Sequence, residues 1–176
     1  MKKFTIEFTW AVIYTLASLL WTVLEKTLGF HDEYVGGQMT FVWLFGLVAI
    51  PIYFFALKDK RDNFYNRSAN WTQLFLSGVI ISVFVALLSP LAQYISLDLI
   101  SPDFIKNNVN YFVTANKMTA GRAEMFFSFR SLVIQAISNG ISVGVILSAI
   151  LALFLRNETK QPTVEAQTAK SKSKRK

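Results

Sequence analysis

The chain contains no cysteine and only one histidine, His31, among its 176 residues. The absence of cysteine excludes disulfides, thiolate zinc sites and cysteine nucleophiles, and a single histidine excludes a histidine-rich metal cage. Charge is scarce as well, because 16% of the residues are Asp, Glu, Lys or Arg, against about 25% in a soluble domain. Hydrophobic residues make up 53%, and the charged residues lie between long apolar runs. This pattern is typical of an integral membrane protein.

Four apolar segments are long enough to cross a bilayer, which takes about 20 helical residues for about 30 Å of hydrocarbon. They cover residues 8–28, 39–57, 74–97 and 131–155. The first follows Lys2 and Lys3, but it is too long for a signal-peptide core and ends in Glu25-Lys26 without a small-residue cleavage site. It is therefore predicted to be an uncleaved span. Residues 1–157 are predicted to form an all-α, four-helix membrane bundle.

The distribution of Lys and Arg predicts the orientation of this bundle. Thirteen of the 18 lie in the N-terminus, the loop between spans two and three, and the tail, and five lie in the two other loops. By the positive-inside rule both termini are expected in the cytoplasm of a bacterial cell, which agrees with an even number of spans. The tail, residues 158–176, is polar and ends in a basic run, so we expect it to be disordered and to contact anionic lipid. Nucleic-acid binding is not expected, because the aromatic residues are in the membrane.

The loop between spans three and four, residues 101–130, is longer than a simple connector. Ser101-Pro102-Asp103 predicts a helix start. Apolar residues then recur at helical spacing on one face, which predicts an amphipathic helical segment: Ile105, Val109, Phe112 and Val113. Thr119 is expected to cap a second helix that continues through Phe129 into span four. Two interpretations stay open: a lid that rests on the bundle or the lipid headgroups, or a lid that grips a ligand.

Small residues recur in steps of four along spans three and four. Span three carries Gly78, Ser82 and Ala86, followed by Pro90, and span four carries Ala136, Gly140, Gly144, Ser148 and Ala152. Such stripes let helix backbones approach closely in lipid, so spans three and four are predicted to pack along them. The sequence does not decide whether they pack within one chain or between two. Pro51 and Pro90 each remove a backbone donor inside a span and predict kinks.

A few polar residues lie within the predicted spans. They are Gln93 in span three and Gln135, Ser138, Asn139 and Ser142 in span four. They are expected to make interhelical hydrogen bonds, with a water-filled path as the alternative. No ionisable residue lies at the centre of a span, which argues against a proton-coupled transporter. The four tryptophans lie toward span ends, where interface anchors are common: Trp10, Trp21, Trp43 and Trp71.

Ionisable residues cluster at the outer end of span one, in the stretch LEKTLGFHDE. The members are Glu25, Lys26, His31, Asp32 and Glu33. We expect an interfacial ion-pair cluster that fixes the end of the span, with Lys26 reaching the headgroups. Glu25 is expected to pair with His31 or with a basic residue of the 101–130 loop, such as Arg122 or Arg130. A proton-sensitive site and a divalent-cation site are the alternatives. No metal and no other cofactor is expected.

Several stretches resemble one family across most of the chain. They are LLWTVLEKTLGFHDE, IYFFALKDKR, ISVFVALLSPLAQYI with the following ISPDF, and KMTAGRAEMFFSFRSLVIQ. Together they resemble an uncharacterised family of small bacterial four-span membrane proteins, known as a numbered domain of unknown function. The resemblance extends to about residue 157. It implies the four-span fold and the bacterial inner membrane, and it supplies no activity, so no functional residue is transferred.

Two functions are compatible with these observations. The first is a non-enzymatic assembly or accessory protein that contacts the lipid bilayer and a second copy or another membrane protein through its small-residue stripes. The second is a small transporter or channel with a polar path between spans one, three and four and Glu25 near its outer mouth. An enzyme is not expected, because no set of residues forms the arrangement of nucleophile, base and orienting group that catalysis needs.

Overall fold

The computed structural model describes residues 3–157, which are helical apart from turns and one isolated bridge. In chain order the elements are α1 (Thr5–Thr27), α2 (Val35–Leu44), α3 (Gly46–Asn63), α4 (Trp71–Tyr94), the π-helix η1 (Ile95–Ile100), α5 (Phe104–Thr114), α6 (Ala120–Phe126) and α7 (Phe129–Leu155). The tail predicted to be disordered, residues 158–176, lies outside the described residues. The predicted all-α class is confirmed.

Four helical segments are long and apolar enough to cross a membrane: Thr5–Thr27, Val35–Asn63, Trp71–Ile100 and Phe129–Leu155. The predicted number and order of spans is therefore confirmed, and this is a multi-pass membrane protein. Each segment begins two to four residues before the predicted apolar run. Spans two and three also end later, at Asn63 rather than residue 57 and at Ile100 rather than residue 97. The reason is that hydropathy marks the lipid-exposed length, whereas the backbone ladder continues through polar residues.

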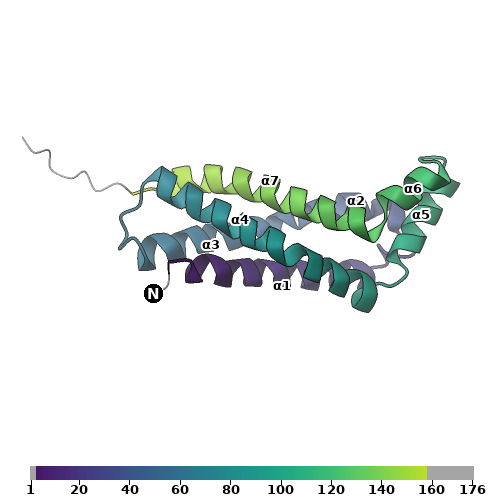
Figure 1. The fold of residues 1–176 in the computed structure, drawn as a ribbon, viewed down its shortest axis with the longest axis horizontal. Helices are drawn as coiled ribbons and strands as arrows, with labels where there is room; N and C mark the ends of the chain where they lie inside the picture. The colour runs from purple at the N-terminus through teal and green to yellow at the C-terminus, as the bar shows by residue number, and fades with distance from the viewer. Residues whose placement is uncertain (1–2, 158–176) are drawn as a thin grey trace, which may run out of the picture.

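The spans lie side by side as an elongated bundle, with α4 along α7 and α1 along α3 and α4 (Figure 1). A Cβ atom at Gly78 would overlap the side chain of Ser148, and one at Gly144 would overlap Ser82 and Tyr53. The predicted packing of spans three and four along their small-residue stripes is confirmed, and it occurs within one chain. Ser82, Ser148 and Ala152 are fully buried, and Ala86 is buried.

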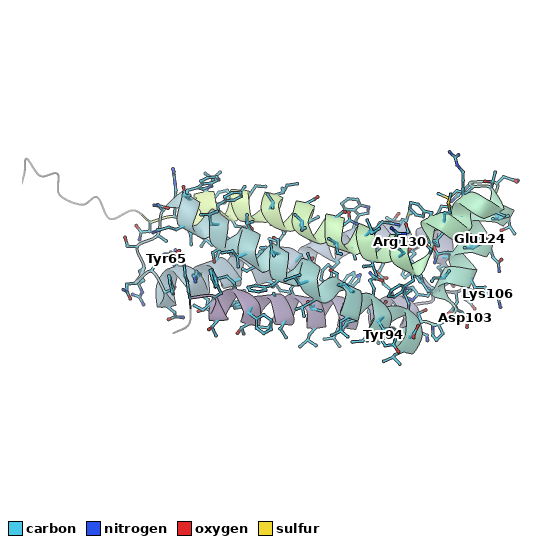
Figure 2. The ribbon with its side chains drawn as sticks, in the orientation of Figure 1. Tyr65, Tyr94, Asp103, Lys106, Glu124 and Arg130 are labelled. Atoms are coloured by element: carbon cyan, nitrogen blue, oxygen red, sulfur yellow. The ribbon has the colours of Figure 1, made fainter. Side chains whose placement is uncertain are left out.

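One end of the bundle gathers the chain termini of the described part and the loop between α3 and α4 (Figure 1). Lys60 Nζ donates to the carbonyl of Lys3 at 2.8 Å, and Arg61 Nη1 donates to the carbonyl of Leu155 at 3.2 Å. The backbone N–H of Asn157 donates to the carbonyl of Ala69 at 2.9 Å. Of the basic residues counted on this side by the topology prediction, those within residues 3–157 therefore lie at one end of the bundle, where Tyr65 is labelled in Figure 2.

Helices α5 and α6 lie at the opposite end of the bundle, where Asp103, Lys106 and Glu124 are labelled (Figure 2). The predicted amphipathic segment is confirmed as α5, which contacts α2 and α6. The expectation of a continuous helix from Thr119 into span four is wrong, because the helix stops at Phe126 and α7 starts anew at Phe129. Ser128 causes the restart, since its Oγ accepts the N–H of Ser131 as an N-cap.

Span three does not end as a regular α-helix. Pro90 lies inside α4, and the chain then passes into the π-helix Ile95–Ile100. A π-turn is wider than an α-turn and is often found at functional sites. Here it places Ser96 and Leu97 toward the interior of the bundle, where both line a cavity.

Candidate functional site

The half of the bundle nearest α5 contains two adjoining cavities. The main cavity, of 480 Å³, lies between α1, α2, α3, α4 and α7. The end cavity, of 260 Å³, extends from it toward α5. Eight residues line both: Ser18, Thr22, Val42, Phe45, Gln93, Ser96, Ala136 and Asn139. The two cavities therefore adjoin along this wall inside the membrane-spanning region, and together they are called the intramembrane space.

The walls of this space are largely apolar in the main cavity and more polar toward the end cavity. Hydroxyl and amide groups from three helices face it: Thr15, Ser18, Thr22, Ser89, Gln93, Ser96 and Asn139. Tyr14, Val85 and Leu147 line the main cavity near the middle of the bundle. An apolar wall with a few convergent polar groups is the usual character of a small-molecule site.

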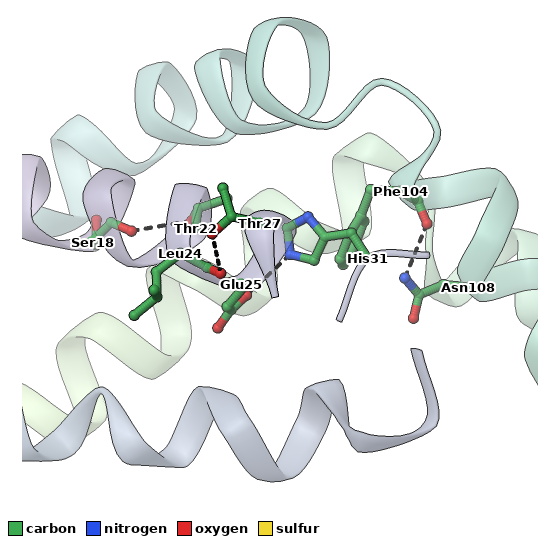
Figure 3. Close-up of polar contacts among 8 residues, drawn as sticks. All are labelled: Ser18, Thr22, Leu24, Glu25, Thr27, His31, Phe104 and Asn108. Atoms are coloured by element: carbon green, nitrogen blue, oxygen red, sulfur yellow. Dashed lines mark hydrogen bonds and ion pairs between the residues drawn. The ribbon is translucent and has the colours of Figure 1, made fainter. Parts of the chain in front are cut away.

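Glu25 and His31 lie at the far end of the space, where both line the end cavity. His31 Nε2 is 3.1 Å from Glu25 Oε2, as the dashed line in Figure 3 marks. Since a carboxylate only accepts, the imidazole N–H donates in this contact. Glu25 is 4% exposed and His31 is 1% exposed. The pair is therefore buried, whereas the sequence predicted an interfacial cluster at the surface.

The turn that carries His31 is built by the end of α1. The N–H of Phe30 donates to the carbonyl of Glu25, and the N–H of Gly29 donates to the carbonyl of Lys26, both at 3.0 Å. Gly29 has a φ of +81°, which only glycine adopts without strain. This is a Schellman termination, and it reverses the chain so that His31 returns to Glu25. The Leu-Gly pair after Lys26 is the sequence signal for it.

Helix α5 holds this turn in place from outside. Asn107 Nδ2 donates to the carbonyl of His31 at 2.9 Å and to Asp32 Oδ1 at 2.8 Å. The Phe104 ring meets the His31 ring edge-on with centroids 4.9 Å apart. Asn107 lies outside the apolar face predicted for α5. Its side-chain amide nevertheless contacts the turn, because the turn offers it two hydrogen-bond acceptors. The segment therefore rests on the end of the bundle, as the first of the two interpretations has it. That it grips a ligand stays a prediction.

The remaining members of the predicted ionic cluster do not join the Glu25–His31 pair. Lys26 Nζ donates to the carbonyl of Ile100 in η1. Asp32 is bound by Asn107, and Glu33 is exposed. Arg122 and Arg130 are exposed and make no ion pair with Glu25. Within residues 3–157, no group of three or more His, Cys, Asp or Glu side chains is placed to hold a metal ion.

Two polar atoms at this end are buried without a hydrogen-bond partner: His31 Nδ1 and Trp21 Nε1. Both residues line the end cavity, and Trp43 lines the main cavity. The sequence predicted these tryptophans to be interface anchors, yet Trp21 also stacks on Phe41 at 5.1 Å between ring centroids inside the bundle. Buried polar atoms without a partner are uncommon and mark a place where a ligand or water would be accommodated.

Of the polar residues predicted within spans three and four, Gln93, Gln135 and Asn139 line the cavities. Gln135 Nε2 donates to the carbonyl of Phe126 and to Ser131 Oγ, which are near it in sequence. Gln93 and Asn139 line both cavities and make no hydrogen bond to another described residue. Ser138 and Ser142 are exposed. The expectation of interhelical hydrogen bonds therefore holds for Gln135, which bonds from α7 to the last residue of α6, and it is wrong for Gln93 and Asn139, whose positions fit the alternative of a polar-lined path.

A second buried ionic group lies at the other end of α1, and sequence reasoning missed it. Lys60 Nζ is 2.8 Å from Glu7 Oε1, and Ser77 Oγ donates to the same oxygen at 2.9 Å. Glu7 and Lys60 are 1% and 2% exposed. Burial raises the pKa of the Tyr65 phenol beside this group, and the Glu7 carboxylate adds to the rise. A lone carboxylate between Ile6 and Phe8 was the available signal, because it requires a buried partner.

Comparison with known proteins identifies the family and no activity. Residues 9–157 match the family described as "Protein of unknown function (DUF4199)". No curated protein and no solved structure matches the chain. The matched region covers most of the first span, the three other spans, both cavities and the Glu25–His31 pair. The chain belongs to the DUF4199 family of proteins of unknown function.

Proposed function

We propose that this protein binds a small molecule within the membrane and carries it across, without catalysing a reaction. The observation that carries the proposal is the pair of adjoining cavities, of 480 Å³ and 260 Å³, between the spans, the second of which is lined by the buried Glu25–His31 pair. A stable bundle in lipid has no need for such a space, since close packing is what holds helices together there. Polar side chains directed into it support a ligand with polar groups.

The closed half of the bundle supports transport over passive conduction. Beyond Tyr14 and Val85 the core is tightly packed around Tyr53, Leu57 and Leu74. A channel needs a continuous path, whereas a carrier exposes its site to one side at a time. The space therefore corresponds to a site that is separated from the basic end of the bundle. We assign that end to the cytoplasm of a bacterial cell, because it carries most of the Lys and Arg.

The alternative role, as an assembly or accessory protein, has lost its main support. It was predicted from the small-residue stripes as a surface for a second copy or another membrane protein. Those stripes are occupied within the chain, since Ser82 and Ser148 are fully buried between α4 and α7. The outward faces carry large apolar residues that fit lipid, such as Leu20, Leu87 and Phe154. We therefore propose the lipid bilayer as the main surroundings of the spans.

Binding of a neutral fluorescent probe tests the proposal. In nanodiscs of zwitterionic lipid, 9-anthracenemethanol is expected to accept excitation energy from Trp21 and Trp43, which line the space. This energy transfer is expected to saturate as the probe concentration rises. Ala136→Phe fills the wall that the two cavities share and is expected to weaken binding about tenfold or more. Ile146→Phe, on the exposed face of the same helix, is the matched control. Equal binding by the two variants would contradict the proposal.

A further inference from the structure

We propose that the ligand is a monovalent organic cation, that Glu25 is its counter-ion and that the Glu25–His31 pair releases a proton as the cation binds. This inference rests on the proposed function and specifies its substrate class. It starts from the charges that face the space. Among the residues that line the two cavities, Glu25 is the acid, His31 is the titratable base, and Lys and Arg are absent.

The neighbouring charged groups do not alter this balance. Lys26 is directed to the carbonyl of Ile100, and Asp32 is bound by Asn107. Asp98 on η1, Glu124 on α6 and Arg130 on α7 are exposed. When His31 is neutral, the walls therefore carry one net negative charge in a region of low dielectric. Such a charge attracts a cation strongly and repels an anion.

Glu25 has an oxygen available for this role. His31 occupies Oε2, and Oε1 accepts no hydrogen bond from another described residue. A carboxylate that is 96% removed from solvent and has a single partner is under-satisfied. Because the side chain lines the end cavity, a cationic group placed there would complete its partners.

The rest of the walls define the remainder of the ligand. Trp21, Phe45 and Phe104 line the end cavity, and an aromatic face attracts an alkylammonium group. The main cavity beyond them is bounded by apolar side chains such as Ile50, Val85 and Leu147. This succession favours a cation whose charged group lies near Glu25 and whose aromatic or aliphatic body extends toward the middle of the bundle.

His31 connects the binding of a cation to a proton. Protonation would occur at Nδ1, which is buried and has no partner, and would make the pair neutral overall. A bound cation and a protonated His31 would then compete for the single negative charge of Glu25. Binding of one cation therefore expels one proton from Nδ1 to water, and the total charge of the site is the same before and after. Histidine is the side chain that makes this exchange between about pH 5 and pH 8.

Two probes with the same ring distinguish this inference from the proposed function. (9-Anthracenylmethyl)trimethylammonium is permanently cationic, and 9-anthracenemethanol is neutral. In nanodiscs of zwitterionic lipid, Glu25→Gln is expected to lower the affinity for the cationic probe about tenfold or more and to leave the affinity for the neutral probe unchanged. Glu124→Gln, the same change at an exposed position of the same end, is expected to alter neither. Retained binding of the neutral probe also reports that the variant is folded.

The proton is measured separately. Between about pH 8 and pH 5.5 the affinity for the cationic probe is expected to fall by up to about tenfold per pH unit, and His31→Gln is expected to remove this dependence. In weakly buffered medium at about pH 6, a pH indicator is expected to report close to one proton released per cation bound.

Three results would overturn the inference. The first is equal affinity of Glu25→Gln and the unaltered protein for the cation, and the second is cation binding without proton release. If the neutral probe binds in either case, the site exists; the first result then rules out the cation as the substrate class, and the second rules out the proton exchange at His31. The third result is that neither probe binds in a saturable way, and then the proposed function fails together with the inference.

Discussion

The two ends of α1 each bury a carboxylate, and the two are used differently. Glu7 and Glu25 lie about 27 Å apart along the helix, at 1.5 Å per residue. Glu7 is held by the Lys60 side chain and by the Ser77 hydroxyl, so that three helices meet at one carboxylate. Glu25 has one partner, the imidazole of His31. The first arrangement joins helices, and the second leaves a charge available for a ligand.

The surroundings of the two carboxylates differ in the same sense. Around Glu7 the core is closed, and the second oxygen of Glu7 is enclosed without a partner. Around Glu25 the helices enclose a space instead of packing. The same residue type therefore has a structural role in the packed half and a proposed binding role in the hollow half. Four predictions test this contrast.

Lys60→Met is expected to have the largest effect. It leaves the buried Glu7 carboxylate without its cation, which costs about 3–5 kcal/mol of folding free energy. The measurement is thermal or denaturant unfolding in nanodiscs. The double variant Glu7→Leu with Lys60→Met is expected to recover most of the loss, because no charge is left buried. Glu25→Gln at the other end is expected to change stability far less. A similar loss for Lys60→Met and Glu25→Gln would remove the contrast.

Two glycines of one stripe are expected to respond in opposite ways. Gly144→Leu would overlap Ser82 and Tyr53 in the packed half and is expected to cost about 3 kcal/mol or more. Gly140→Leu meets only Val85, at 3.5 Å for the Cβ, and extends into the main cavity. It is expected to preserve stability and to reduce binding of the neutral probe. Unfolding and probe titration of both variants check this, and equal stability loss would contradict it.

Asn107→Ala is expected to loosen the hollow half alone. It removes two hydrogen bonds, to the His31 carbonyl and to Asp32, each with a net contribution of about 1 kcal/mol. Hydrogen exchange followed by mass spectrometry is expected to increase in residues 28–34 and to stay unchanged in α3. Asn110→Ala, at an exposed position of the same helix, is the control. Increased exchange throughout the bundle would argue against a local role.

Gly29→Ala is expected to have the smallest effect on stability. An alanine at a φ of +81° is strained by about 1 kcal/mol, and the strain falls on the turn that returns His31 to Glu25. Tyr34 also leaves little room, at 3.1 Å from the added Cβ. The expected result is a small change in unfolding with a clear change in the pH dependence of cationic-probe binding. An unchanged pH profile would mean that the turn does not position His31.

Much of the fold is predictable from composition and spacing because lipid imposes a simple rule. Every spanning backbone must satisfy its hydrogen bonds internally, so a long apolar run is a helix. This determined the four spans, and the repeats of small residues determined that α4 meets α7. The amphipathic spacing of Ile105 and Val109 likewise predicted α5. The loop ends were less predictable, as the restart at Ser128 illustrates, since a single N-cap decides it.

The sequence predicted which residues belong to the candidate site, but it did not predict their burial or their contacts. The sequence marked Glu25 and His31 as neighbours, but burial of the pair follows from Gly29 reversing the chain and from Asn107, far away in sequence, holding the turn. The same applies to Lys60, which the sequence placed in a loop and which Glu7 binds 53 residues away. Hydropathy and periodicity describe how each helix meets its solvent. Which polar groups face one another depends on how the helices rotate and approach, and only the tertiary structure determines that.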